Sequence, residues 1–252
     1  ATGGWADLMP AHTQMLFPVP DRVSDEDAVL ADPFAVSLHA VVNHPPPPGG
    51  RVVVWGAGAL GSTATAILRA LYPDVEVAVV ARFDGQADLA RRLGAALVLP
   101  SDDRRVVLEE LAAWSGGSLV TGTTGLPMCH PGGVDVVYDT IGKPETLEVG
   151  VRVLRARGTL VKTGFHAPGR WEWSPLYFKE LSWVGSNAFG IEEVEGRRRH
   201  ALEHYFDLVA DGRIAIGSML THTFRLEEWR QAFVTIADQG ATGAVKVAFD
   251  HR

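Results

Sequence analysis

The sequence predicts a doubly wound α/β fold in which a parallel sheet is covered by helices on both faces. Near-continuous apolar runs alternate with helical patterns along the chain, as expected for strands buried on both sides. The first of these runs, Val52 to Trp55, leads directly into the pattern Gly56-x-Gly58-x-x-Gly61. The chain has 252 residues, 46% of them hydrophobic, which is enough for a sizeable buried core.

Apolar runs bounded by turn residues predict five further strands, with helices between them. The strands are expected at Val75 to Val80, Ala96 to Leu99, Val134 to Tyr138, Thr159 to Thr163 and Leu181 to Gly185. The helices are expected after the glycine pattern, with Ala64, Ile67, Leu68 and Leu71 on one face, and at Gln86 to Leu93, Val106 to Trp114 and Glu145 to Leu154. Ser115 to Gly133 is rich in Gly, Thr and Pro and is expected to form an irregular loop.

The two ends of the chain have a different pattern. A helical stretch is expected over Asp25 to His39, interrupted at Pro33, and a long helix over Glu193 to Ala210. A strand at Met219 to Phe224, a helix carrying Trp229, Ala232, Phe233 and Ile236 on one face, and a closing strand at Ala244 to Phe249 follow. We expect residues 1–24 and 213–252 to be portions of a second domain, and residues 25–212 to form the main α/β domain.

Composition excludes several classes of function. The net charge of −7 argues against nucleic acid or an anionic membrane as partner. No apolar run has the length of a membrane span, and the first residues lack a secretory signal pattern. Cys129 is the only cysteine, so an internal disulfide and a cysteine zinc cluster are excluded. These features favour a cytoplasmic protein that acts on a small molecule.

The glycine pattern has a physical reading as a dinucleotide-binding loop. Gly56 permits a tight turn, Gly58 lets the backbone approach a pyrophosphate, and Gly61 lets the helix pack closely on the strand. The helix that begins near Ala59 and Leu60 then presents unpaired N–H groups and a positive dipole end to the phosphates. The alternative is a glycine-rich turn without a ligand.

The end of the second strand predicts which dinucleotide binds. Domains that prefer NAD place a carboxylate about 20 residues beyond the glycine loop, where it binds the ribose 2′-hydroxyl. Here that position is Ala81, followed by Arg82. A guanidinium suits a phosphate dianion, so the sequence predicts NADP(H). Two alternatives remain: Arg82 points to solvent and NAD is tolerated, or the nearby Asp84 reaches the ribose.

Several motifs, in order and spacing, resemble the medium-chain dehydrogenase/reductase superfamily, specifically its zinc-binding alcohol-dehydrogenase-like members. The resemblance rests on the segments Gly3 to Asp7, Phe17 to Asp21, Ala28 to Pro33, Leu38 to Val41, Gly133 to Gly142, Gly158 to Gly164 and Gly243 to Phe249. It covers nearly the whole chain. It implies a Rossmann domain with remnants of a GroES-like catalytic domain at both ends.

The resemblance also implies roles for residues at the carboxyl ends of the later strands. Asp139, Thr140 and Ile141 are expected against the adenosine ribose. Thr163, Gly164 and Phe165 are expected beside the nicotinamide, with Ser186 to Ala188 on its other side. None of these residues supplies acid–base chemistry by itself, so the catalytic residues stay unknown.

A zinc site is implied by the family but is sparsely represented in these residues. Family members carry a longer N-terminal segment that holds most zinc ligands, so we expect this chain to be a C-terminal portion of a parent protein. Asp32 is the one candidate ligand; alternatively it caps a turn before Pro33. His39 is expected to be packed or hydrogen-bonded. His200 and His204 are expected on a solvated helix face beside three arginines.

The family resemblance implies an NADP(H)-preferring, zinc-dependent alcohol/aldehyde or ketone dehydrogenase. Two alternatives stay open: a zinc-free quinone or enone reductase of the same superfamily, and a non-catalytic nucleotide-binding module. A homodimer is expected through Leu181 to Phe189, because an apolar edge strand with few charges and no proline invites pairing. The alternative is that a loop or the C-terminal segment covers this strand.

Overall fold

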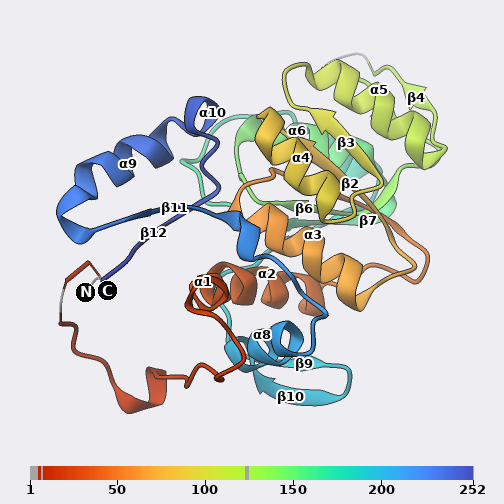
Figure 1. Ribbon diagram of the computed structural model, residues 1–252. Helices are drawn as coiled ribbons and strands as arrows, with labels where there is room; N and C mark the ends of the chain where they lie inside the picture. Colours follow the sequence, from red (N-terminus) through yellow and green to blue (C-terminus); the bar gives the residue numbers. More distant parts are fainter. Residues whose placement is uncertain (1–4, 7, 123–124, 252) are drawn as a thin grey trace.

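Six parallel strands form the central sheet of the computed structural model, which describes residues 5–6, 8–122 and 125–251 (Figure 1). Their order is β3-β2-β1-β6-β7-β8. The bounds are β1 Arg51–Trp55, β2 Glu76–Ala81, β3 Leu97–Pro100, β6 Val134–Asp139, β7 Leu154–Lys162 and β8 Ser182–Gly185. All six predicted strands are confirmed, and this strand order is that of a Rossmann-like fold.

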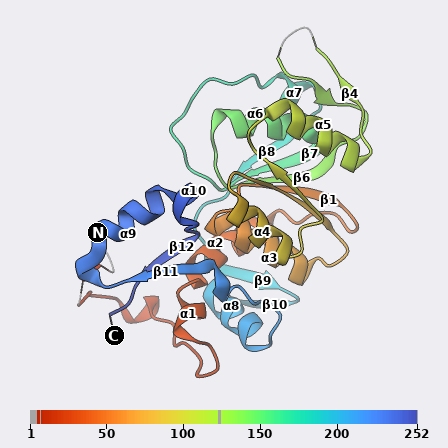
Figure 2. The same ribbon diagram turned by 45° about the horizontal axis from the view of Figure 1, so that its top comes forward.

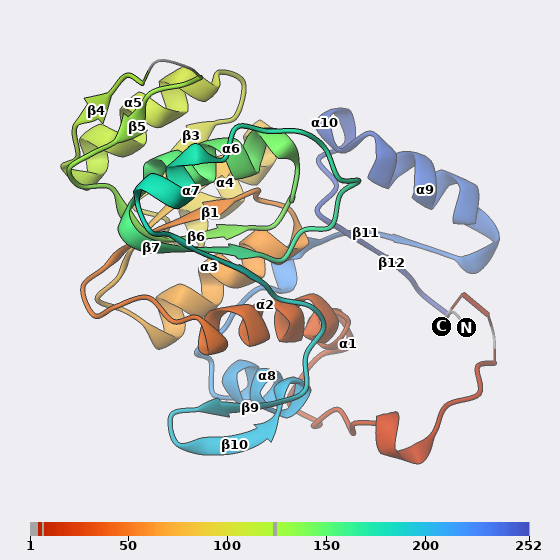
Figure 3. The same ribbon diagram turned by 180° about the vertical axis from the view of Figure 1, so that it is seen from behind.

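Helices cover both faces of the sheet, as the apolar strands predicted. One face carries α2 Ala31–Asn43, α3 Ala59–Leu71, α4 Asp84–Arg92 and α8 Ala201–Ala210, and the other carries α5 Arg104–Ser115, α6 Pro144–Val153 and α7 Ser174–Phe178. Successive residues of β1 divide between two cores: Val52 and Val54 pack on the first face, and Val53 and Trp55 on the second. Figures 1 and 3 show α2 and α8 as successive layers beyond α3.

The expectation of one long helix over Glu193 to Ala210 is wrong. β9 Ile191–Val194 and β10 Arg197–His200 form an antiparallel hairpin, and only then does α8 begin. The turn residues Glu195 and Gly196 have φ of 51° and 76°, which is the backbone of a two-residue hairpin turn. Burial in β9 alternates from residue to residue, a strand period that the helical interpretation overlooked.

Two smaller expectations also need correction. The helical stretch near residue 30 is interrupted at Val29 and Leu30, between α1 Asp25–Ala28 and α2, and not at Pro33. Pro33 lies in the first turn of α2, where a proline is tolerated because no N–H is needed there. Within the expected loop Ser115 to Gly133, a short hairpin forms between β4 Leu119–Val120 and β5 Met128–Cys129.

The C-terminal segment forms a small unit beside the sheet (Figure 2). β11 Leu220–Phe224 pairs in parallel with β12 Lys246–Phe249, and α9 Trp229–Ala237 and α10 Gln239–Thr242 connect them. The ring of Trp5 packs at 4.9 Å from Phe233 and 6.0 Å from Phe249, so the two ends of the chain meet. The division at residues 24 and 212 stays a prediction; Gly3, Gly4 and Asp7 of the first resembling motif lie outside the described residues.

Candidate functional site

A cavity of about 440 Å³ lies at the carboxyl ends of β1, β2 and β6. β1 has β2 on one side and β6 on the other, so this is the point where the strand order reverses and ligands of such sheets bind. The predicted residues that line it are Gly56, Gly58, Ala59, Leu60, Arg82, Thr140 and Ile141. The structure therefore gathers around one cavity a set that the sequence scatters over 86 positions, from 56 to 141.

The three glycines of the loop differ in what surrounds them. A Cβ on Gly61 would lie 1.8 Å from the carbonyl oxygen of Gly56, so α3 packs against the strand end too closely for any side chain. Gly56 has φ of 96°, and a Cβ there would lie 2.6 Å from Thr140 Oγ1. A Cβ on Gly58 would meet no described atom within 4 Å. Gly58 thus leaves the backbone open on the cavity side.

The N-terminus of α3 is free to receive an anion. Gly58 occupies the N-cap position and has no side chain to accept from the first N–H groups of the helix. Ala59 and Leu60, the first two helical residues, line the cavity. Unpaired N–H groups and the positive end of the helix dipole therefore face the position that a pyrophosphate would take.

Three cationic residues, Arg82, Arg104 and Lys143, line the cavity, together with one acidic residue, Glu145. The Arg82 guanidinium is exposed and lies 5.2 Å from the ring centroid of Phe83. Ala81 is buried beneath it, and Asp84 is exposed at the start of α4. Arg104 and Lys143 also line the cavity, together with Ser101 and Gln86. Sequence reasoning missed these residues, although Ser101 directly follows a strand end, which is the usual place for a ligand contact.

Asp139 lies behind the cavity and not on its lining. Its side chain is fully buried, and one carboxylate oxygen accepts the N–H groups of Ile141 and Gly142, both at 2.9 Å. The other oxygen accepts the Thr146 hydroxyl at 2.8 Å. Burial raises the pKa of Asp139, while these three hydrogen bonds favour the charged form. Asp139 therefore shapes the turn that presents Thr140 and Ile141.

The residues expected near the nicotinamide form a second group, at the ends of β7 and β8. Gly164 packs on the turn after β6, where a Cβ would lie 2.3 Å from the carbonyl carbon of Ile141. Thr163 Oγ1 donates to the carbonyl of Asp139 at 3.2 Å, and Phe165 is 94% exposed. Ser186 is buried, and its hydroxyl has no hydrogen-bond partner among the described residues. A buried polar atom without a partner calls for a water or a ligand.

The described residues do not fit a zinc site. A protein zinc site needs about three side-chain ligands, and in the described part of the chain no three His, Cys, Asp or Glu side chains cluster closely enough. Asp32 is exposed in the first turn of α2.

No helix in the described part of the chain is long and apolar enough to cross a membrane.

Three of the nine histidines of the chain have partners that hold them in the fold. His39 is hydrogen-bonded to Glu192 at 2.7 Å, as expected of a packed histidine. The expectation that His200 and His204 lie on a solvated helix face is wrong. His200 caps α8 and stacks on Phe17 at 4.1 Å, and His204 is buried with Nε2 3.1 Å from the Glu192 carbonyl oxygen. The hairpin takes the place of the first half of the expected helix, and His204, in the helix that follows it, is buried.

Comparison with known proteins identifies the family. The sequence profile of a family described as zinc-binding dehydrogenase matches residues 59–210. The chain therefore belongs to the zinc-binding dehydrogenases of the medium-chain dehydrogenase/reductase superfamily, as the motifs implied. D-arabinitol dehydrogenase 1 of Uromyces fabae is 25% identical over 94% of this chain and 62% of its own length. L-threonine 3-dehydrogenase of Anaeromyxobacter sp. is 27% identical over 96% of this chain and 63% of its own length.

Solved structures show the same fold. A protein of Sinorhizobium meliloti described as a zinc-binding dehydrogenase, bound to NADP, superposes with a TM-score of 0.71 and 26% identity. The match covers 93% of this chain and 62% of that protein. This chain thus spans a little over 60% of the length of each of the three relatives named here.

Proposed function

We propose that the whole protein is an NADP(H)-preferring oxidoreductase that moves a hydride between the cofactor and an alcohol, aldehyde or ketone. The observation that carries this proposal is the open backbone at Gly58, next to a cavity where Arg82 stands in place of the carboxylate that would select NAD. NADP bound to the S. meliloti protein supports it. The hydride chemistry belongs to the nicotinamide, and the chain positions it.

Different groups of residues would hold different parts of the cofactor. The N–H groups at the start of α3 would bind the pyrophosphate, and Arg82 the 2′-phosphate. Thr140 and Ile141 would lie against the adenosine ribose, with Asp139 fixing their turn. Thr163, Gly164, Phe165 and Ser186 would surround the nicotinamide, and the unpartnered Ser186 hydroxyl supports a polar ligand there.

Zinc dependence is proposed from family membership alone, since the described residues supply no ligand set. Asp32 keeps its place as the candidate ligand within this chain. The competing functions are a zinc-free quinone or enone reductase and a non-catalytic nucleotide-binding module. Metal analysis of the whole protein, with alcohol and quinone substrates assayed side by side, separates them: stoichiometric zinc with alcohol turnover supports the first proposal.

A homodimer through the edge strand β8 is proposed with it, for a cytoplasmic protein without nucleic-acid or membrane partners. β8 is the last strand of the described sheet, so its outer N–H and C=O groups face away from it. Trp183 on β8 is 46% exposed, and Tyr177 and Phe178 just before it are 75% and 69% exposed. An exposed edge with aromatic side chains beside it suits pairing with a second copy across a two-fold axis.

The choice of cofactor is tested by replacing Arg82. Arg82→Ala should weaken NADPH binding by about 1 to 3 kcal/mol, the range for a charge-assisted contact, and leave NADH binding unchanged. Arg91→Ala is the matched control, because Arg91 is exposed on α4 and pairs with Asp88 at 2.7 Å. Equal losses for both cofactors in Arg82→Ala would show that Arg82 does not read the 2′-phosphate.

A further inference from the structure

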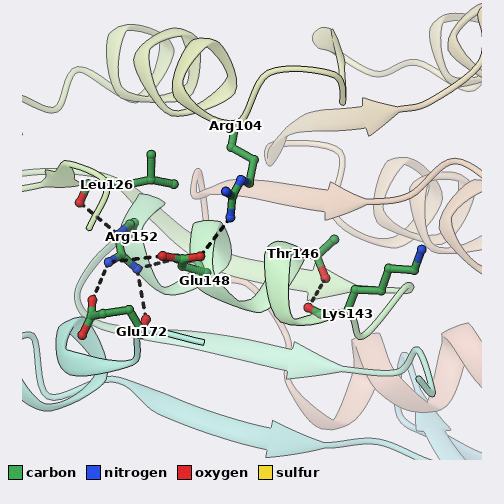
Figure 4. A network of polar contacts seen from close by, with 7 residues as sticks. All are labelled: Arg104, Leu126, Lys143, Thr146, Glu148, Arg152 and Glu172. Carbon is green, nitrogen blue, oxygen red and sulfur yellow. Dashed lines mark hydrogen bonds and ion pairs between the residues drawn. The ribbon is translucent and has the colours of Figure 1, made fainter. Parts of the chain in front are cut away.

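Arg104 is a cationic side chain of the cavity that the proposed function leaves without a role. It begins α5, directly after the carboxyl end of β3, and its side chain is 45% exposed. Its guanidinium donates to Glu148 on α6 at 2.9 Å (Figure 4). Among the described lining residues, Arg82, Arg104 and Lys143 are the cations of the cavity. Of these, Arg104 is the one held by an ion pair within the described chain.

The sheet register places Arg104 on the same side of the cavity as Arg82. Ala81 pairs with Pro100 across β2 and β3, so the next residues, Arg82 and Ser101, leave the sheet side by side. Three residues later Arg104 starts its helix. Lys143 follows β6, on the far side of β1. Arg82, Ser101 and Arg104 therefore line the cavity together, next to the adjacent carboxyl ends of β2 and β3.

Glu148 can release Arg104 without becoming an unpaired buried charge. Its side chain is 15% exposed and also lies 3.7 Å from the guanidinium of Arg152. Arg152 is itself fixed: it is 1% exposed, pairs with Glu172 and donates to the carbonyl of Leu126 at 3.0 Å (Figure 4). A permanent cation thus stands beside Glu148 whether or not Arg104 stays.

The charge of the ligand favours more than one cation. A phosphate monoester carries about −1.5 to −2 at neutral pH and offers three strong acceptor oxygens. Arg82 alone balances about half of that charge. We infer that Arg104 is a second residue that binds the 2′-phosphate of NADP(H), and that it exchanges Glu148 for this phosphate when the dinucleotide binds. This inference rests on the proposed function.

The exchange gives Glu148 a definite part as the competitor for Arg104. In the free chain the carboxylate holds the guanidinium near the cavity in a satisfied pair. In the complex the pair must open, so Glu148 lowers the affinity for NADPH. NADH has a 2′-hydroxyl in place of the phosphate, so no anion competes with Glu148 and Arg104 keeps its ion pair when NADH binds. Arg104 and Glu148 therefore act on the choice between the two cofactors.

The first experiment measures binding of NADPH and NADH by nicotinamide fluorescence for the unmodified chain, Arg104→Ala and Arg105→Ala. Arg104→Ala should raise the Kd for NADPH about tenfold, as for a lost charge-assisted contact, and leave the Kd for NADH unchanged. Arg105→Ala is the control: it removes the same charge one residue away, from a side chain outside the cavity lining. Thermal unfolding of each free variant checks that the fold is retained.

The second experiment removes the competitor. Glu148→Gln keeps the shape of the side chain and should tighten NADPH binding a few-fold, by analogy with surface charge pairs. In the double variant Arg104→Ala/Glu148→Gln that gain should vanish, because Glu148 acts through Arg104. A gain of the same size in the double variant would overturn the exchange.

The outcomes distinguish this inference from the proposal beneath it. If the unmodified chain binds neither cofactor, the proposed function fails. If it binds NADPH and Arg104→Ala binds it equally well, Arg104 does not contact the phosphate and the inference fails alone. A loss shared equally by NADPH and NADH, or a loss equalled by Arg105→Ala, also overturns it.

Discussion

The parallel strands of the central sheet begin at one side, here called the amino edge, and end at the other, the carboxyl edge. These two edges hold their charged side chains in opposite ways. At the amino edge, Arg152 and Lys179 are 1% and 3% exposed, and each is surrounded by groups of the chain itself. At the carboxyl edge, Arg82 and Arg104 are exposed around a cavity, with one ion pair between them and the rest of the described chain. Buried charges with complete sets of partners serve the fold, while exposed cations around a cavity leave donors for a ligand.

The amino edge shows how complete such partnering can be. Lys179 Nζ donates to the carbonyls of Cys129, Arg152 and Leu154, at 3.5 Å and 3.0 Å for the first two. Burial lowers the pKa of Lys179 to about 8, whereas the carbonyl dipoles favour the ammonium. For Glu172, burial raises the pKa, but hydrogen bonds from Ser174 and Arg152 outweigh it and hold the pKa below its usual value. These contacts join α6, α7 and the start of β7.

The largest effect is expected at this amino edge. Arg152→Leu removes a donor from the carbonyls of Leu126, Glu148 and Glu172 and one partner of the Glu172 carboxylate. At about 1 to 3 kcal/mol for each buried group left unpaired, the free energy of unfolding should fall by about 3 to 5 kcal/mol in total. Arg91→Leu breaks an exposed pair and should change it by less than about 1 kcal/mol. Urea unfolding followed by circular dichroism measures both. Similar losses of unfolding free energy in the two variants would show that the buried partners of Arg152 stabilise the fold no more than an exposed ion pair does.

Two glycines of the loop at the carboxyl edge are expected to affect stability and cofactor binding differently. Gly61→Ala forces a methyl group to within 1.8 Å of the Gly56 carbonyl oxygen, so it should destabilise the fold by about 1 to 3 kcal/mol and abolish NADPH binding. Gly58→Ala meets no described atom within 4 Å and should fold normally. Its methyl group would nevertheless stand on the open backbone and weaken NADPH binding. If Gly58→Ala binds NADPH normally, the pyrophosphate lies elsewhere.

Glu192 extends the comparison to a buried carboxylate away from the sheet edges. It is 5% exposed; burial alone raises its pKa, but hydrogen bonds from His39, Asn43 and the Gly190 N–H hold the pKa below its usual value. Glu192→Gln should lower the free energy of unfolding at pH 7 by about 1 to 3 kcal/mol.

The pH dependence of this effect has a definite sign. Because the folded pKa is depressed, the charged carboxylate stabilises the fold above its unfolded pKa of about 4.3, and the stabilisation is lost as the pH falls through the folded value. The difference between the unmodified chain and Glu192→Gln should therefore shrink below about pH 4. Glu193→Gln, at the exposed neighbouring position, is the control and should show a flat difference. A difference that stays flat as the pH is lowered would assign the effect to packing.

The edge strand gives the smallest effect on stability. Val184→Lys should leave the fold intact, because Val184 is only half-buried, and should convert the proposed dimer to a monomer in sedimentation equilibrium. Tyr177→Ser changes only the neighbouring aromatic surface and should weaken the dimer without abolishing it. Thr159→Lys would not serve as a control, because it alters a strand within the sheet. A folded Val184→Lys that stays dimeric places the interface elsewhere.

The sequence predicts the sheet and the glycine loop because both rest on local rules. Short apolar runs such as Val52 to Trp55, bounded by turn residues, are typical of buried strands between helices. Gly61 is required by a contact with Gly56 five residues away. The β9–β10 hairpin was missed because Arg197 to His200 is polar and continuous with a true helix. Its strand character depends on a turn at Glu195 and Gly196 with positive φ.

The site could be predicted only where a single strand end defines it. Arg82 follows β2 and is visible from the spacing to the glycine loop. Arg104 is brought to the same cavity by the pairing of β2 with β3, and its partner Glu148 lies on another helix, so neither is apparent from the sequence order. The family resemblance implied that Asp139 lies against the ribose. Its carboxylate accepts from Ile141, Gly142 and Thr146, and these partners are not apparent from a carboxylate at a strand end alone.

The central claim is that the cavity at the ends of β1 and β2 binds NADP(H) in preference to NAD(H). Titrating the unmodified chain with NADPH and with NADH, under one set of conditions and at constant ionic strength, tests it directly by nicotinamide fluorescence. We expect saturable binding of NADPH with a Kd at least about tenfold below that for NADH, because two cationic side chains would contact the one phosphate. Equal affinities, or no saturable binding of either nucleotide, would contradict it.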